Sequence, residues 1–210
     1  MTPQDAVKKL EVSFPGIITD QTEFRGEVSV FVAAGKIAEV CRFLKNNCTF
    51  DMLTDLSGID NFGEEPRFRV DYLLYSFTHR VRLRLKVSVA QENPVVDTVT
   101  TVWKTADWHE REAFDMYGIK FAGHPNLKRI LMWEGYPYHP LRKDFPLAGL
   151  PADLPQNAQD AGRAETAPML GGPFVAATGT NRTISREPRQ YDTGAEFLEK
   201  QKSPVKKEQV

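Results

Sequence analysis

The feature that most constrains the fold is a pair of alternating apolar runs at residues 67–89, RFRVDYLLYSFTHRVRLRLKVSV. Alternation with a period of two is typical of a β-strand that buries one face. If Thr78 and His79 form the turn, the two runs pair as an antiparallel hairpin. Leu74 then lies opposite Leu83, Tyr72 opposite Leu85 and Val70 opposite Val87, so apolar residues face each other along the hairpin. The face that this hairpin would bury consists of Phe68, Val70, Tyr72, Leu74, Val81, Leu83, Leu85, Val87 and Val89.

The opposite face of the hairpin mixes apolar and basic side chains, namely Leu73, Tyr75, Phe77, Arg80, Arg82, Arg84 and Lys86. Aromatic rings interleaved with cations are typical of sheets that bind single-stranded RNA. The alternative is that the cations lie in water with their aliphatic stems over apolar neighbours. The chain has a net charge of −1 and shows no RNP-type motif, which favours the solvated face over RNA binding.

Short helices and strands are predicted on both sides of the hairpin. We expect a helix at residues 5–12, a strand at 27–32, an amphipathic helix at 35–47 and a strand at 50–60 that ends near Gly58. Beyond Pro94 the pattern predicts one short helix at 97–104 and a second at 105–118, with Gly118 as the C-cap. Residues 119–133 should form a loop and a short strand, and 135–147 should run extended between prolines. The predicted class is α/β (α+β), a small mixed or antiparallel sheet with helices packed on it.

The composition changes after residue 150 and indicates a second region. Residues 151–210 contain six prolines, five glycines and three aromatic residues. A segment of this kind buries too little apolar surface to offset its chain entropy alone. We therefore divide the chain into a domain at 1–150 and an extended tail at 151–210, which is either disordered or ordered only by lying along a partner. A capping box at Thr193 and Glu196 predicts one short helix within the tail.

The motifs do not support metal or redox chemistry on this chain. His109 and Glu110 begin the H-E-x-x-H zinc motif, but Ala113 occupies the position of the second histidine. The two cysteines, Cys41 and Cys48, cannot supply the four thiolates that an iron–sulfur cluster usually takes, and they do not form a C-x-x-C pair. We expect both to be buried free thiols.

No segment of the sequence resembles a membrane anchor or a secretion signal. The first residues, MTPQDAVKKLEVSF, lack the apolar core of a signal peptide. No run of about 18 apolar residues follows. The sequence therefore predicts a cytosolic chain, or one that is attached to a membrane through a partner.

The helix predicted around WHEREAFDMYG has one mostly apolar stripe, formed by Ala106, Glu110, Ala113, Phe114 and Tyr117. A carboxylate on a buried stripe needs a partner, because an unpaired buried charge is costly. Glu110 is therefore expected to have one. Arg111 and Asp115 lie on a neighbouring face, where an ordinary solvated position accounts for both.

This helix opens a longer pattern, EREAFDMYGIKFAGHPNLKRIL at 110–131, which is followed by PLRKDFPL at 140–147. Together with the upstream LTDLSGID and the hairpin, the pattern resembles the 30 kDa (C-type) subunit family of the proton-pumping NADH-quinone oxidoreductase, respiratory complex I. The resemblance covers roughly residues 5–150 and leaves out the tail. It is carried by Glu110, Arg111, Glu112, Asp115, His124, the Lys128–Arg129 pair, Arg142, Lys143 and Asp144.

The resemblance implies a non-catalytic structural subunit in the hydrophilic arm of the complex, on the cytoplasmic side of the inner cell membrane. It implies that FMN and the iron–sulfur clusters belong to partner subunits, and that the chain docks on subunits of the D and B types. The charged residues of the pattern would organise the docking region, with Arg142, Lys143 and Asp144 presented to a neighbour. The equivalent subunit of a membrane-bound hydrogenase, or of another quinone-reducing complex, is the alternative.

Overall fold

The computed structural model describes residues 1–147, 149 and 150. The chain divides into two units, Met1–Asp144 and Phe145–Val210, and the helices and strands given below belong to the first. The expectations for residues 151–210, including the helix near Thr193 and the ordering on a partner, lie outside the described residues and stay predictions.

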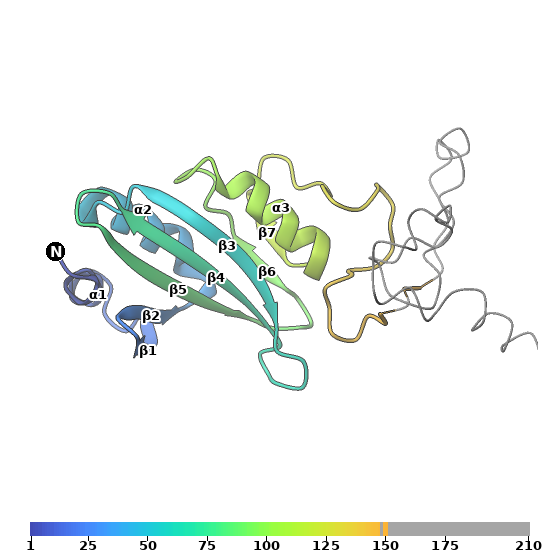
Figure 1. The fold of residues 1–210 in the computed structure, drawn as a ribbon, viewed down its shortest axis with the longest axis horizontal. Coiled ribbons are helices and arrows are strands. Elements are labelled where there is room, and N and C mark those ends of the chain that lie inside the picture. The colour runs from blue at the N-terminus through green and yellow to red at the C-terminus, as the bar shows by residue number, and fades with distance from the viewer. Residues whose placement is uncertain (148, 151–210) are drawn as a thin grey trace, which may run out of the picture. The chain divides into compact units, whose positions relative to one another are not determined.

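A mixed sheet of five strands forms the centre of the first unit, in the order β1-β2-β5-β4-β3 (Figure 1). Its strands are β1 (Ile18–Phe24), β2 (Glu27–Val32), β3 (Met52–Asp60), β4 (Phe68–Ser76) and β5 (Val81–Val89). Strands β2 and β5 run parallel, and the other neighbours are antiparallel. The predicted class, an α+β fold with a small mixed sheet, is confirmed.

The central hairpin of β4 and β5 has the register that the sequence predicts, with Leu74 opposite Leu83. The two-residue turn is wrong. The last pair is Ser76 with Val81, so four residues form the loop. One of them, Arg80, takes a positive φ of 55°. Thr-His is not a pair that favours the left-handed angles of a tight hairpin turn, and a longer loop avoids that requirement.

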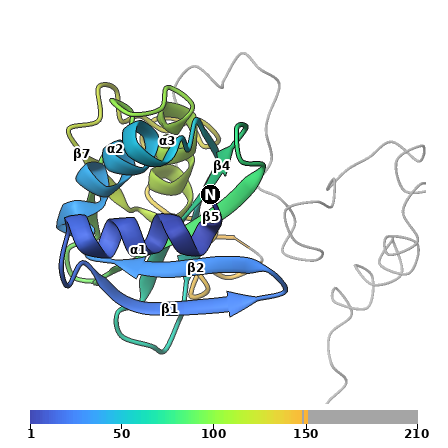
Figure 2. The same ribbon diagram turned by 90° about the vertical axis from the view of Figure 1, so that its left-hand side faces the viewer.

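The first two helices form close to where the sequence pattern predicts them. Helix α1 (Pro3–Ser13) starts with a capping box, because Thr2 and Asp5 bond reciprocally to each other's backbone N–H groups. Helix α2 (Ile37–Cys48), preceded by the short 3₁₀ helix η1 (Ala34–Lys36), buries the predicted stripe that includes Cys41. Cys41 and Cys48 are free and buried, as expected. Figure 2 shows α1 lying along the β1–β2 hairpin.

The third helix, α3 (Ala106–Tyr117), packs beside β3 and ends at Gly118, as predicted. The predicted helix at 97–104 is wrong. Residues 95–97 instead form strand β6 (Val95–Asp97), which pairs in parallel with β7 (Lys120–Ala122), and turns follow up to α3. Seven of the eight residues from 95 to 102 are valine or threonine, and such β-branched side chains fit a strand better than a helix.

The sequence pattern does not predict strand β1, because ITDQTEF lacks an apolar alternation and six of its seven residues are exposed. The signal that could have revealed the strand is the turn. Arg25 and Gly26 both have positive φ, 53° and 78°, and connect the paired residues Phe24 and Glu27. Two-residue hairpin loops favour such angles.

The core lies on one face of the sheet, between the strands and the three helices. Alternate residues of β4 and β5 are buried there, including Tyr72 and Leu85 at 0% exposure. Gly58, where the sequence predicts the end of β3, lies inside the strand. An added Cβ would come within 2.6 Å of the Tyr117 ring, so glycine is what lets α3 approach the sheet. None of the helices in the described part of the chain is long and apolar enough to cross a bilayer.

Candidate functional site: helix α3 and the segment 124–144

Asp115 holds the segment after β7 against helix α3. Its carboxylate is completely buried. One oxygen accepts hydrogen bonds from the backbone N–H groups of Ile130, Leu131 and Met132, at 2.9, 2.7 and 3.0 Å. The other lies 2.6 Å from Arg129 Nη1. Burial alone would raise the pKa of Asp115, but these donors outweigh it and hold the pKa below its ordinary value. The solvated position expected for Asp115 from the sequence is therefore wrong.

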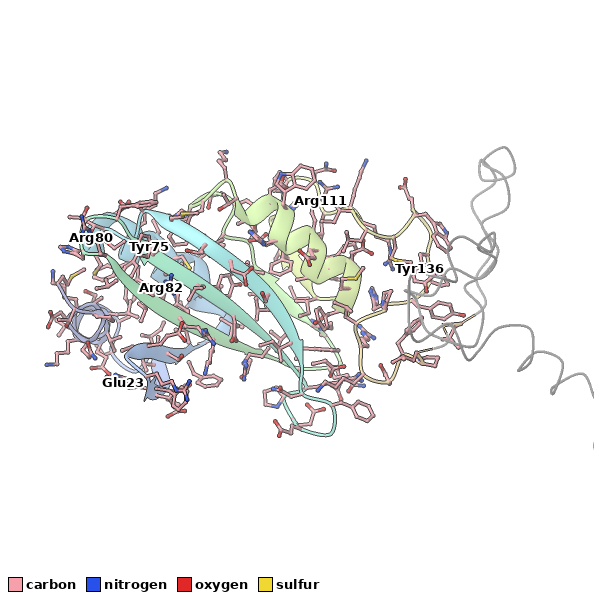
Figure 3. All side chains as sticks on the ribbon, viewed as in Figure 1. Glu23, Tyr75, Arg80, Arg82, Arg111 and Tyr136 are labelled. Carbon is pink, nitrogen blue, oxygen red and sulfur yellow. The ribbon has the colours of Figure 1, made fainter. Side chains whose placement is uncertain are left out.

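Arg111 and Arg129 add further contacts between helix α3 and the segment after β7. Arg111 donates from Nε to the Lys128 carbonyl at 3.1 Å, and its guanidinium lies 5.1 Å from the centre of the Trp108 ring. Arg129 also donates to the Asp115 carbonyl at 3.1 Å and lies over the ring of Tyr136. Figure 3 labels Arg111 on the outer side of α3 and Tyr136 farther along the chain. The charged residues of the motif thus fasten a loop to a helix.

The carboxyl end of α3 is capped by the same segment. The carbonyl of Asp115 accepts a hydrogen bond from His139 Nδ1 at 2.9 Å. The backbone N–H of Leu141 donates to Met116, and Arg142 Nε donates to Tyr117 at 2.7 Å. The last carbonyls of a helix lack partners inside the helix, and cations there also suit its dipole. Arg142 therefore serves α3 itself.

Gly118 makes this cap sterically possible. Its φ is +78°, the left-handed region that glycine enters without strain. An added Cβ would lie 2.5 Å from Arg142 Nη2 and 2.6 Å from His139 Nε2. The glycine is thus required both for the backbone angle and for the close approach of the two cap residues.

A second ion cluster, centred on Arg67, fixes the end of the P-L-R-K-D motif. The guanidinium is bidentate to Asp60, at 2.8 and 2.9 Å, and lies 3.0 Å from Asp144. The backbone N–H of Lys143 also donates to Asp60, at 2.8 Å. Hydrogen bonds from Arg67 lower the pKa values of both carboxyls. The side chains of Arg67 and Asp60 are 5% and 1% exposed, so this is a buried pair.

Glu110 lies in a third polar cluster, beneath the start of α3. Its side chain is fully buried and accepts hydrogen bonds from Thr98 Oγ1 at 2.5 Å and Val99 N–H at 2.7 Å. His124 Nε2 lies 3.9 Å from Glu110 and 3.1 Å from the Asp107 carboxylate. The partner expected for a buried Glu110 is thus the loop after β6. Burial raises the pKa of Glu110 to about 7, against the lowering effect of these bonds.

The raised pKa of Glu110 predicts a pH-dependent stability. Folding favours the protonated carboxyl of Glu110. The stability that this group contributes is therefore fully present below its ordinary pKa of 4.5, and it is lost as the pH rises from there to about 7. Between pH 5 and pH 8 the loss should be about 2–3 kcal/mol. Glu110→Gln, which stays neutral, should remove this part of the pH dependence in urea unfolding curves. Glu112→Gln on the exposed face serves as the control, and the same slope in all three proteins would contradict the prediction.

The remaining motif residues have few contacts within the chain. Glu112 is exposed, and the described residues give it no hydrogen bond or ion pair. Lys143 contributes its backbone N–H to Asp60, and the residue is exposed. Asp144 is 47% exposed despite its contact with Arg67. That the motif residues also contact neighbouring proteins stays a prediction.

The basic sheet face is partly neutralised and interrupted by its own neighbours. Arg84 lies 3.0 Å from Glu27, and the Lys86 ammonium lies over the Phe31 ring at 5.3 Å. Arg82 is exposed and, within the described part of the chain, has no such partner. This arrangement lacks the continuous track of free cations that a phosphate backbone needs.

Sequence reasoning did not find Arg67, Asp60, Thr98 or His139. Their contacts join segments far apart in the chain, such as Arg67 with Asp144. No spacing rule links such pairs. Gly58 carried a usable signal, because a glycine inside a strand pattern indicates a close approach.

These features define a small α+β domain, in which charged side chains fasten the turn-rich segment after β7 to a helix and a sheet. The chain belongs to the family described as the 30 kDa subunit of respiratory-chain NADH dehydrogenase, whose profile matches residues 30–151. It is 48% identical over 145 residues to the C-type subunit of NADH-quinone oxidoreductase from Geobacter sulfurreducens, covering 69% of this chain and 90% of that protein. The corresponding protein of Roseiflexus sp. is 49% identical over 143 residues, covering 67% and 82%.

Two solved structures share the fold. One is a trypsin-resistant fragment of Nqo5, with a TM-score of 0.54 and 27% identity, covering 60% of this chain and all of that one. The other is a chain of an archaeal respiratory membrane complex, the membrane-bound sulfane sulfur reductase. It has a TM-score of 0.60 and 21% identity, covering 69% of this chain and 85% of that one, and shows likeness of fold alone.

Proposed function

We propose that this chain is a non-catalytic structural subunit in the hydrophilic arm of a proton-translocating NADH:quinone oxidoreductase. The observation that carries the proposal is its 48% identity to a C-type subunit over 90% of that protein. The geometry supports a structural role. Asp115, Arg129 and Arg142 bind backbone groups of their own chain, and so they shape a surface.

The proposal assigns the redox groups, FMN and the iron–sulfur clusters, to other subunits of the complex. It assigns docking to neighbours of the D and B types, and membrane contact to the assembled complex at the cytoplasmic side of the inner membrane. The segment at 128–144 supports the docking role, because Asp115 and Asp60 hold backbone N–H groups near its two ends before a partner binds. A surface that is already ordered loses less entropy on association.

The alternative partner set is that of a related membrane-bound hydrogenase or another quinone-reducing complex. A pull-down of the tagged chain from native membranes separates the two. The proposal expects subunits of the D and B types together with flavin- and cluster-containing NADH-oxidising subunits. Recovery with hydrogenase subunits in their place would overturn the assignment of the electron donor.

Arg111→Ala tests whether the site serves assembly. The substitution removes the bonds to the Lys128 and Arg129 carbonyls, at 3.1 and 3.4 Å. Loss of about 1–2 kcal/mol should lower this chain's ratio of folded to unfolded molecules about 5–30-fold, and the amount of assembled complex should fall with it. Quinone reduction by NADH should fall in parallel on native gels of the membrane fraction.

The matched control is Arg42→Ala, an exposed arginine on α2 for which the described residues provide no ion pair. It should leave both assembly and turnover unchanged. If Arg111→Ala instead left assembly complete while turnover vanished, the residue would act in the reaction itself, and the non-catalytic role would have to be abandoned.

A further inference from the structure

Near the β4–β5 loop, the open face of the sheet carries a row of three side chains of types that are common at protein interfaces. Met52 of β3 pairs with Tyr75 of β4, which pairs with Arg82 of β5, so the three lie side by side across the strands. They point away from the core, because the alternate residues of these strands are buried on the other face. Figure 3 labels Tyr75, Arg80 and Arg82 close together at this end of the sheet.

An exposed aromatic ring extends the row. Phe77, in the loop, is 61% exposed and meets Tyr75 edge to face, with ring centroids 5.1 Å apart. Met52 is 38% exposed. Aromatic residues, methionine and arginine are the types enriched at the centres of protein interfaces. We name the five residues Met52, Tyr75, Phe77, Arg80 and Arg82 the loop-end patch.

The charges of the loop-end patch are open to a partner. Arg80 and Arg82 are exposed, and the described residues offer neither guanidinium an ion pair or a side-chain hydrogen bond. Asp51, the acid beside Met52, lies at the margin of the patch, where its carboxylate accepts the backbone N–H of Phe77 at 3.3 Å, and within the described residues it forms no ion pair with Arg80 or Arg82. Two unpaired arginines beside apolar rings are complementary to carboxylates on an otherwise apolar segment.

The extent of the charge favours a polypeptide over RNA. Farther along the same face, Arg84 is bound to Glu27, and Arg69 to Asp71 at 2.7 Å. Within the described part of the sheet, the cations of this face without an ion pair are Arg80 and Arg82 at the loop end and Lys86, which lies over the Phe31 ring beyond the paired Arg84. A nucleic-acid strand needs a longer basic track for its phosphates. Two exposed arginines at one end of the sheet suit a short segment that carries one or two carboxylates.

We infer that the loop-end patch binds an acidic segment of a neighbouring protein in the assembled complex. Carboxylates of that segment pair with Arg80 and Arg82, and its apolar side chains cover the other three residues of the patch. This surface is distinct from the segment 124–144 that carries the family motif. The inference rests on the proposed function to the extent that the partner is a polypeptide of the complex.

The test places a photo-reactive side chain in the complex itself. Phe77→p-benzoylphenylalanine keeps an aromatic ring at the patch, and native membranes are irradiated before the adducts are identified by mass spectrometry. We expect one dominant adduct with a segment of another protein of the complex that contains aspartate or glutamate. Phe24→p-benzoylphenylalanine, 71% exposed at the β1–β2 loop, is the matched control and should give at least about tenfold less of that adduct.

A charge variant tests the arginine pairing. Arg82→Glu combined with the Phe77 probe should lower the yield of the adduct about tenfold or more, because it places like charges opposite each other. Arg42→Glu on α2 makes the same charge change outside the patch and should leave the yield intact. Thermal unfolding of both purified variants establishes that they fold.

The outcomes separate this inference from the proposed function. A complex that retains the chain but gives no adduct from Phe77, an adduct with a segment free of acids, or a nuclease-sensitive adduct with RNA overturns the inference alone. An adduct whose yield ignores Arg82→Glu also overturns it. A chain that migrates free of any complex on native gels overturns both.

Discussion

Asp115→Ala is expected to lower the free energy of unfolding by about 3–5 kcal/mol, because it leaves three N–H groups without their acceptor and a largely buried arginine without its carboxylate. Those groups are Arg129 and the backbone N–H groups of residues 130–132. Total stabilities of natural domains are only about 5–15 kcal/mol, so such a loss removes a large share of the stability of the domain. Urea unfolding of the purified full chain measures the effect.

The control for Asp115 lies on the same helix. Glu112→Ala removes a carboxylate that is exposed, and its effect should stay within about 0.5 kcal/mol. Asp115→Asn should fall between the two, because the amide oxygen still accepts N–H groups but the charge facing Arg129 is gone. Equal unfolding midpoints for Asp115→Ala and Glu112→Ala would show that the buried carboxylate does not hold the loop.

Arg67→Ala is expected to have an effect of similar size, about 3–5 kcal/mol, for the complementary reason. The substitution leaves the Asp60 carboxylate buried at 1% exposure with only the backbone N–H of Lys143 as a donor. The pKa of Asp60, now held low by Arg67, should rise toward and above its ordinary value. Urea unfolding at neutral pH gives the loss of stability.

The pH dependence makes the Arg67 prediction specific. A carboxyl whose folded pKa is depressed stabilises the chain above its unfolded pKa of 3.8, and this stabilisation is lost as the pH falls through the folded value. Between neutral and acidic pH, the free energy of unfolding should therefore fall less in the Arg67→Ala variant than in the parent chain. Arg84→Ala, which breaks a more exposed pair with Glu27 on the open face, should cost less than about 1 kcal/mol. A cost for Arg67→Ala no greater than for Arg84→Ala would refute the buried cluster.

Much of the fold was predictable because its signals are local. The hairpin register followed from two matched apolar alternations, and α3 ended at Gly118 as its C-cap position requires. The helix expected at 97–104 does not form. Its first residue belongs to strand β6, whose pairing partner, residues 120–122, follows α3 in the chain. Strand β1 was not predicted because an edge strand facing solvent has no apolar pattern to detect.

The sequence by itself determined the family, the main strands and helices, and the need of Glu110 for a buried partner. Only the tertiary structure decided which charges are buried. Asp115 and Glu112 look alike as acids on one helix, yet Asp115 is fully buried and Glu112 is exposed. The physical reason is that periodicity reports which side of an element faces the core. The partner of a charge, by contrast, depends on segments such as 128–132 or 143–144, which the folded chain brings to it from elsewhere.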